Sequence, residues 1–162
     1  MSIYSVDKLI AEARRLAREY REATGKTLAI TGEIAINDAI RLLAMSAAPK
    51  DGVGFDAIMI YKAQKLRVQI KGRAIVNTQR AGHRLGQLKL EQNWDAIVLV
   101  IMDVDFETQE IYLAQREAIV EVLSESKNKR GSISIARFKI IGELLWSAEN
   151  GIENNAHWSN TD

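Results

Sequence analysis

The sequence predicts a single α/β domain built on a central mixed β-sheet that is flanked by helices. Apolar residues at helical spacing and helix-capping residues predict two helices near the N-terminus. Two short β-rich runs within residues 56–72 predict a hairpin, and a continuous apolar run over residues 96–102 predicts a strand buried on both faces. A chain of 162 residues can bury a proper core. We expect the domain to cover residues 1–146 and a polar, frayed tail to cover residues 147–162.

Both N-terminal helices are expected to precede the hairpin. Ser5 can cap the first helix, which runs over about residues 6–24 and stops at Gly25. Thr31 can cap the second helix, which continues to about Met45. Apolar residues nearly encircle the second helix, so we expect it to be buried on more than one side.

The second half of the chain predicts further strands and helices of the same domain. A polar turn follows the buried strand and leads into a short β-rich run, so these residues predict a second hairpin. The remaining expected elements are a helix over residues 116–123, a short strand over residues 132–135 and an amphipathic segment over residues 138–146.

Three polar residues share one face of the first predicted hairpin, namely Asp56, Gln69 and Lys71. If residues 62–65 form the turn, Asp56 lies opposite Lys71 and Ile58 lies opposite Gln69. Paired residues share a face, and side chains alternate between faces along a strand. A three-residue turn or a bulge would change the pairing and could move Asp56 to the opposite face.

These residue types suit the chemistry of phosphate esters. A carboxylate, an amide oxygen and an ammonium at one strand end can bind a divalent cation and a phosphate, as nucleases do. The alternative is an ordinary cross-strand pair between Asp56 and Lys71 on a solvated edge, which contributes little to stability. The residues of the hairpin alone leave both interpretations open.

The order of these residues resembles the PD-(D/E)xK superfamily, the restriction-endonuclease-like nucleases. In that family a helix with an acidic residue precedes a hairpin that carries an Asp and a (Glu/Gln)-x-Lys element, and a helix and a further strand follow. Asp56 matches the hairpin aspartate, and Gln69, Ile70 and Lys71 match the Glu-x-Lys element. Glu33 matches the acid on the helix. The resemblance therefore implies a restriction-endonuclease-like core with two helices before the catalytic hairpin.

The resemblance covers about residues 31–123 and departs from the family pattern at two positions. Phe55 stands where the motif has Pro, and Gln69 stands where most members have Glu. Gln is an accepted variant in branches that resemble the methyl-directed restriction enzymes. A neutral ligand is still expected to weaken metal binding, because hard cations prefer charged oxygens.

The resemblance implies metal-dependent hydrolysis of phosphodiester bonds in nucleic acid, with DNA favoured over RNA. Asp56 and the Ile70 carbonyl would hold Mg²⁺, for which Mn²⁺ can substitute, and Gln69 and Glu33 would complete its coordination through water. Lys71 would orient the attacking water and stabilise the developing negative charge. Because cleavage of both strands needs two active sites in this superfamily, a homodimer is plausible.

Glu33 also has a purely structural explanation. It lies in the first turn of the second predicted helix, where a negative charge favours the positive end of the helix dipole. The resemblance instead implies a metal ligand, or a carboxylate that orients water, on the side of the helix that faces the hairpin.

Basic residues are concentrated next to the predicted site. The net charge is +1, yet residues 62–89 hold eight Lys and Arg residues and no acid, which leaves 14 basic and 21 acidic residues elsewhere. Such a strip in an otherwise acidic protein predicts phosphate-backbone binding, although a solubilising face without a ligand is the alternative. The residues expected to contact nucleic acid are Lys65, Arg67, Arg73, Arg80, His83, Arg84 and Lys89.

Composition excludes several other classes of function. The chain has no cysteine, which excludes disulfides, thiolate zinc sites and cysteine nucleophiles. His83 and His157 are too few and too far apart for a histidine metal site. The longest apolar run is too short to cross a bilayer and the N-terminus lacks a signal-peptide layout, so we expect a cytoplasmic protein without a membrane partner.

Two other classes of function fit the same sequence. The first is a catalytically inactive nuclease fold that acts as a nucleic-acid-binding, immunity or accessory module, an interpretation that the neutral Gln69 supports. The second is a domain that binds a small molecule or a protein and has an incidental basic face. Binding that weakens as salt rises would separate the first class from the second.

Overall fold

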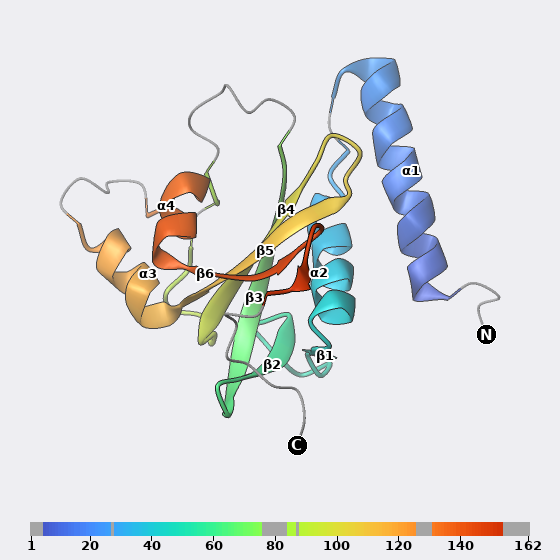
Figure 1. Ribbon diagram of the computed structural model, residues 1–162. Helices are drawn as coiled ribbons and strands as arrows, with labels where there is room; N and C mark the ends of the chain where they lie inside the picture. The colour runs from blue at the N-terminus through green and yellow to red at the C-terminus, as the bar shows by residue number, and fades with distance from the viewer. Residues whose placement is uncertain (1–4, 27, 76–83, 87, 126–130, 154–162) are drawn as a thin grey trace.

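A seven-stranded mixed sheet with helices on both faces forms the centre of the molecule (Figure 1). The computed structural model describes residues 5–26, 28–75, 84–86, 88–125 and 131–153. The strands lie in the sheet in chain order, from β1 to β7, and β3 and β4 form its parallel pair while the other neighbours are antiparallel. The predicted α/β class with a mixed sheet and flanking helices is therefore confirmed.

The two N-terminal helices lie close to their predicted bounds. Helix α1 (Val6–Thr24) begins after Ser5, whose side chain accepts a hydrogen bond from the Lys8 amide, and ends at Gly25 with a positive φ of 72°. Helix α2 (Thr31–Leu42) begins where predicted but ends earlier. The prediction that Thr31 caps it is wrong, because Ile30 occupies the N-cap position and no side chain caps the helix.

The predicted hairpin is formed by β2 (Ala57–Tyr61) and β3 (Gln64–Ala74). The turn contains only Lys62 and Ala63, with φ of 49° and 64°, as in the two-residue turns that match strand twist. The predicted four-residue turn is therefore wrong, and Ile58 pairs with Arg67 rather than with Gln69. The pairing differs from the prediction by two residues, and a two-residue shift leaves every paired side chain of β2 and β3 on its predicted face.

The centre of the sheet follows the prediction, and part of the connection into it lies outside the described residues. All residues of β4 (Ala96–Met102) are buried, and β5 (Thr108–Gln115) returns beside it. The described residues between β3 and β4 contain no helix, whereas the resemblance implies one after the hairpin. Helix α3 (Arg116–Leu123) follows β5 and has its predicted bounds.

The C-terminal elements differ from the prediction. The expected strand over residues 132–135 is reduced to an isolated β-bridge between Ser134 and Arg84. The Ser134 side chain accepts from the Arg137 amide, and helix α4 (Ile135–Ile141) begins directly after it. The expected amphipathic segment over residues 138–146 divides into the end of α4 and strand β6 (Glu143–Ser147).

The sheet continues past residue 146, where the sequence predicted the start of a frayed tail. A turn with Gly151 at φ 67° leads to β7 (Gly151–Ile152), which pairs with β6. Polar residues form this turn because their side chains bond within it, as when Ser147 Oγ donates to Glu153 Oε1 at 2.6 Å. At the opposite edge, β1 (Ser46–Ala47) pairs with β2.

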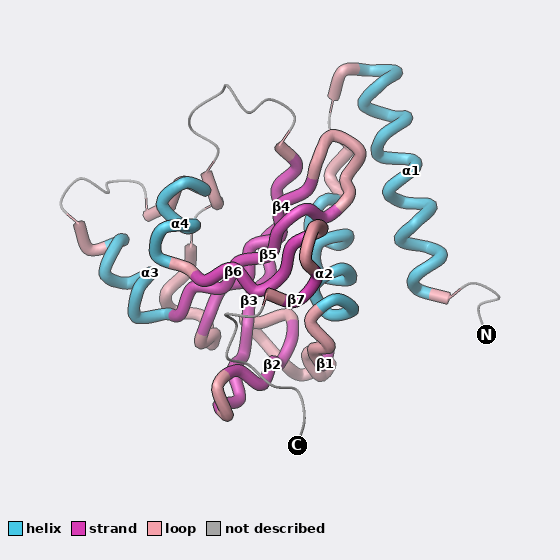
Figure 2. The backbone as a smooth tube through the Cα atoms, in the orientation of Figure 1, coloured by secondary structure: helices cyan, strands magenta, loops and turns pink. Residues whose placement is uncertain are grey.

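Separate hydrophobic clusters lie on the two faces of the sheet. Figures 1 and 2 show α1 and α2 on one side of the sheet and α3 and α4 on the other. Alternate residues of β3, such as Val68 and Ile70, point into the cluster under α2. Gly72 lets α2 approach closely, since a Cβ there would lie 2.5 Å from the Ala35 Cβ. The other face of β3 is the one that carries Gln69 and Lys71.

The sheet is strongly curled. The Tyr61 hydroxyl at the end of β2 donates to Glu143 at the start of β6, although three strands lie between β2 and β6 in the sheet. In a flat sheet those strands would lie about 19 Å apart, at about 4.8 Å for each step. Burial and the hydrogen bond to Glu143 both raise the pKa of Tyr61.

Candidate active site

Asp56 lies at the edge of β3, directly before the start of β2. Pairing between the two strands ends at Val68, and β3 continues past that point. Asp56 Oδ2 accepts a hydrogen bond from the Ile70 amide at 2.8 Å, and the Asp56 amide donates to the Val68 carbonyl at 2.9 Å. One carboxylate oxygen of this half-buried residue is therefore fixed by the backbone, while Oδ1 has no hydrogen-bond partner in the part of the chain that the structure describes.

Gln69 is almost fully buried, with 8% of its surface exposed. Its amide nitrogen donates to the Gly54 carbonyl and to Gln92 Oε1, each at 2.7 Å. Both amide protons are thus used, since a primary amide has two. The Gln69 side-chain oxygen is the atom that remains for a cation or a water molecule.

Lys71 lies two residues further along the same face of β3 and is half-buried. Its ammonium makes no hydrogen bond or ion pair with any residue in the described ranges. The cross-strand pair with Asp56, which the sequence left open, is therefore not formed there. A half-buried cation without a partner is costly unless a ligand or water compensates it.

Glu33 does not join this group. Helix α2 contacts Gly72 of β3 through the Thr31 carbonyl and the Ala35 side chain. Glu33 is two positions from Thr31 and two from Ala35, which is about half a turn around the helix. The Glu33 side chain therefore points away from β3. Glu33 is exposed and has no hydrogen bond or ion pair with the other described residues.

Arg67 is already paired with an acid from outside the basic strip. Its guanidinium makes two hydrogen bonds of 3.1 Å to Asp95, and its backbone amide donates to Asp95 Oδ2 at 2.8 Å. The hydrogen bond from the Arg67 side chain lowers the pKa of Asp95, and the same bond raises the pKa of Arg67. The strip is therefore less positive in space than it is in sequence.

Two other arginines of the strip bind protein groups. Arg73 donates to the carbonyls of Gly72 and Arg84 at 2.6 and 3.1 Å, and burial lowers its pKa. Arg84 donates to Ser132 Oγ and to the Ser132 carbonyl at 2.9 and 3.0 Å. These guanidiniums hold residues 84–86 against β3 and against the residues before α4.

The remaining predicted nucleic-acid contacts divide into two groups. Lys65 and Lys89 are exposed, and neither side chain is paired within the described ranges. Arg80 and His83 lie outside the described residues. Among the described residues of the basic strip, three side chains have no protein partner, namely Lys65, Lys71 and Lys89.

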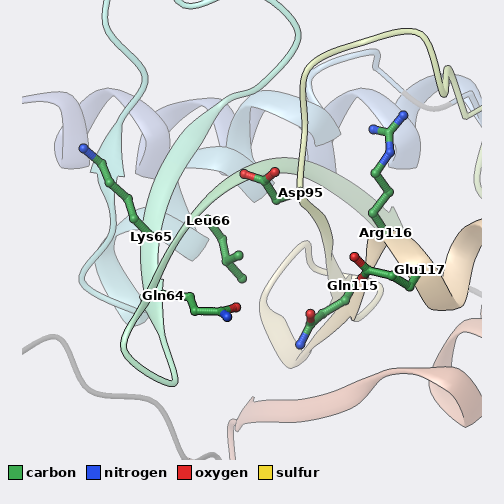
Figure 3. Close-up of a pocket in the computed structure, with 7 residues that line it drawn as sticks. All are labelled: Gln64, Lys65, Leu66, Asp95, Gln115, Arg116 and Glu117. Carbon is green, nitrogen blue, oxygen red and sulfur yellow. The ribbon is translucent and has the colours of Figure 1, made fainter.

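A cavity of about 420 Å³ lies at the far end of β3 from Asp56 and Lys71. Figure 3 shows residues of β3 on one side and residues of the β5–α3 junction on the other. Lys65 is the predicted nucleic-acid contact among its lining residues. The lining residues are Gln64, Lys65, Leu66, Asp95, Gln115, Arg116 and Glu117. The cavity is therefore separate from the predicted catalytic residues.

The segment before β4 contributes to the site, and the sequence prediction missed it. Gln92 accepts the bond from Gln69, and the amide of Asn93 lies against Gly54, where a Cβ would be 2.9 Å away. Gln92 is 23 positions from Gln69 in the chain, and no periodicity or motif connects them. Within the described ranges, no group of three His, Cys, Asp or Glu residues is placed to hold a metal ion.

No protein-family model matches the sequence, and no curated protein matches it. Among the described residues, no helix combines the length and the apolar character needed to cross a membrane.

Proposed function

We propose that this protein is a metal-dependent nuclease that hydrolyses phosphodiester bonds in nucleic acid, DNA more than RNA. The observation that supports it best is the grouping of Asp56, Gln69 and Lys71 at one edge of β3, with the Asp56 carboxylate 2.8 Å from the Ile70 amide. The order of the three residues along the hairpin is the one that resembles the PD-(D/E)xK superfamily.

The oxygen atoms of this edge fit a single Mg²⁺ or Mn²⁺ ion. Asp56 supplies a carboxylate, Gln69 supplies an amide oxygen, and the Ile70 carbonyl points to the same edge of β3 as the amide that bonds Asp56. Mg²⁺ keeps several waters and is commonly held by one or two carboxylates together with substrate phosphates. When bound, the ion would acidify a water molecule and screen the charge of the phosphate.

Lys71 has two tasks in the proposed reaction. Its ammonium attracts the phosphate into the site, and it donates a hydrogen bond to the oxygen on which negative charge develops. In hydrolysis the oxygen of water bonds to phosphorus, the bond from phosphorus to one ester oxygen breaks, and that ester oxygen takes up a proton.

A second candidate is a nucleic-acid-binding module without catalysis. It is favoured by the neutral amide of Gln69 and by the position of Glu33 on the far side of α2, which together leave Asp56 as the carboxylate of the proposed site. Such a protein would bind nucleic acid through Lys65, Lys71 and Lys89 without cutting it.

The experiment that separates these candidates is a cleavage assay on single-stranded, duplex and branched DNA and on RNA, with Mg²⁺, Mn²⁺ or EDTA. The variants are Asp56→Ala and Lys71→Ala, and Lys8→Ala is the matched control because it removes a lysine from α1, on the other side of the sheet. We expect metal-dependent cutting by the parent and by Lys8→Ala, and none by the other two. Salt-sensitive binding without cutting in any condition would select the second candidate and exclude the first.

A further inference from the structure

Gln69 is held in a setting built for an amide rather than for a carboxylate. Its nitrogen lies 2.7 Å from two oxygen atoms, the Gly54 carbonyl and Gln92 Oε1. A carboxylate at this position would place an oxygen without a proton against both. The Gly54 carbonyl belongs to the backbone and cannot exchange its role, so the site selects Gln at position 69.

Gln92 in turn belongs to a tightly bonded loop over residues 89–94. The backbone amide of Gln92 and the indole nitrogen of Trp94 both donate to the Lys89 carbonyl, at 3.2 and 2.9 Å. The backbone amide of Trp94 donates to the backbone carbonyl of Gln92 at 3.1 Å. Trp94 is buried, with 1% of its surface exposed. This loop fixes the backbone from which the Gln92 side chain reaches Gln69.

Arg116, the first residue of α3, binds the backbone of this loop. Its guanidinium donates to the carbonyls of Gln92 and Trp94 at 3.2 and 2.9 Å, and also to the Leu90 carbonyl. The same guanidinium lies over the Trp94 ring, 4.5 Å from its centre. One cation thus binds three carbonyls of the loop, and the planar donor geometry of arginine suits that task better than lysine would.

We infer that Gln92 is a positioning residue for Gln69, and that the loop held by Arg116 sets how tightly the edge of β3 binds a divalent cation. The inference rests on the proposed function. Because Gly54 and Gln92 use both amide protons, the Gln69 oxygen points away from them and cannot exchange places with the nitrogen. Partners of this kind, one shell away from a metal ligand, commonly change metal affinity by about 10–100-fold.

The test compares three single variants in the full-length protein. Gln92→Leu removes the acceptor, Gln92→Glu keeps an acceptor oxygen, and Asn93→Ala is the matched control because Asn93 is an exposed residue of the same loop. Solvent exchange of the Gln69 side-chain amide protons, followed by NMR without metal, reports the hydrogen bonds directly. Mn²⁺ affinity without nucleic acid, with Asp56→Ala as the null variant, reports the effect on the site.

We expect Gln92→Leu to lose protection of one Gln69 amide proton and to bind Mn²⁺ about tenfold more weakly. Gln92→Glu should retain the protection and bind Mn²⁺ at least as tightly as the parent, and Asn93→Ala should match the parent in both measurements. Rescue by Gln92→Glu distinguishes positioning from a general loss of stability, which thermal unfolding of each variant measures.

Two results would overturn the inference in different ways. Mn²⁺ binding that disappears in Asp56→Ala but is unchanged in Gln92→Leu would refute the role of Gln92 and leave the proposed function standing. A parent protein that binds no Mn²⁺, although both Gln69 amide protons are protected, would refute the proposed metal site and the inference together.

Discussion

Asp38 and Lys71 are both shielded in part from solvent, but they differ in whether they have protein partners. Asp38 on α2 is buried, and its Oδ2 accepts from Arg14 at 2.6 Å and from the Thr108 hydroxyl at 2.7 Å. Lys71 on β3 is half-buried and has no partner among the described residues. Asp38 therefore links α2 to α1 and β5, while Lys71 links β3 to no other described element.

The difference separates a structural charge from a functional one. Arg14 also donates to the Phe106 carbonyl at 2.8 Å, so the Asp38 network fastens α1 to α2 and to the turn before β5. A buried charge that is paired specifies how elements pack, although it adds little net stability compared with an apolar core. Asp38 Oδ1 is buried and accepts no hydrogen bond within the described residues, although Arg41 Nη2 lies 3.6 Å from it. An ammonium kept without a partner retains its hydrogen-bonding capacity for a ligand such as phosphate.

The largest expected effect is the loss of the closer of two arginine partners of Asp38. Arg14→Ala removes the 2.6 Å pair and leaves the buried carboxylate with Arg41 at 3.6 Å, so it should lower the free energy of unfolding by about 3–5 kcal/mol. Arg15→Ala is the matched control, because Arg15 is the next residue of the same helix and pairs with Glu12 and Glu19 on the exposed surface. Urea unfolding measures both, and equal losses in the two variants would contradict the comparison.

Lys71→Met is expected to reduce cleavage strongly while leaving the free energy of unfolding nearly unchanged. Methionine keeps most of the apolar part of the side chain and removes only a charge that has no partner among the described residues, so stability should be unchanged or slightly higher. Cleavage, if the proposed function holds, should fall at least about 100-fold. Urea unfolding and the rate of cleavage are measured on the same preparation. A loss of stability as large as that of Arg14→Ala would show that Lys71 is structural.

Gln69→Glu tests a neutral group that lies in the proposed site yet has protein partners. The change replaces two hydrogen bonds with contacts between oxygens, and we expect it to cost about 1–3 kcal/mol in the free energy of unfolding. Glu is the commoner residue of the resembling family, so a gain in stability together with tighter Mn²⁺ binding would contradict the amide-specific setting. Gln64→Glu, an exposed position on the same strand, is the control.

The smallest expected effect is a loss of stability at high pH that arises from Tyr112, whose hydroxyl donates to Glu110. Burial and a hydrogen bond to Glu110 raise the pKa of Tyr112 to about 12. The pKa of an unfolded tyrosine is about 10, so this contribution to stability is fully present below about pH 10 and is lost as pH rises through about 12. We expect the loss to stay below about 1 kcal/mol because partly exposed pairs are screened. Urea unfolding of the parent and of Tyr112→Phe at several pH values measures it, and the variant should lack this loss.

Elements fixed by local chemistry could be predicted closely. The apolar run of β4 and the residues that bound α1 and α3 all carry their signal within a few neighbouring positions. The hairpin turn could not be predicted, because Lys62 and Ala63 adopt positive φ without a glycine or asparagine to indicate it. The shared face of Gln69 and Lys71 nevertheless followed, since the side-chain period of a strand is two residues.

The environment of the site depends on contacts between distant parts of the chain. The prediction that Gln69 and Lys71 share a face agrees with the two-residue period of β3, and the Asp56 carboxylate bonds the Ile70 amide of the same strand. The catalytic roles of the three residues stay predictions. The hydrogen bond that Gln69 donates to Gln92 and the pairing of Arg67 with Asp95 arise from tertiary packing, so no local pattern indicates them. The side of α2 on which Glu33 lies was decided by the close approach of Ala35 to Gly72, which the sequence does not reveal.

The curl of the sheet has a consequence for the order in which this chain folds. The bond between Tyr61 and Glu143 joins residues 82 positions apart, whereas the β2–β3 hairpin closes over a two-residue turn. Hairpins form within about 1–10 μs, but contacts between distant residues must await the closure of long loops. We therefore expect the edge that carries Asp56 and Lys71 to assemble early and the contact between β2 and β6 to form late. Replacing Tyr61 with Phe should then mainly accelerate unfolding and leave the folding rate nearly unchanged.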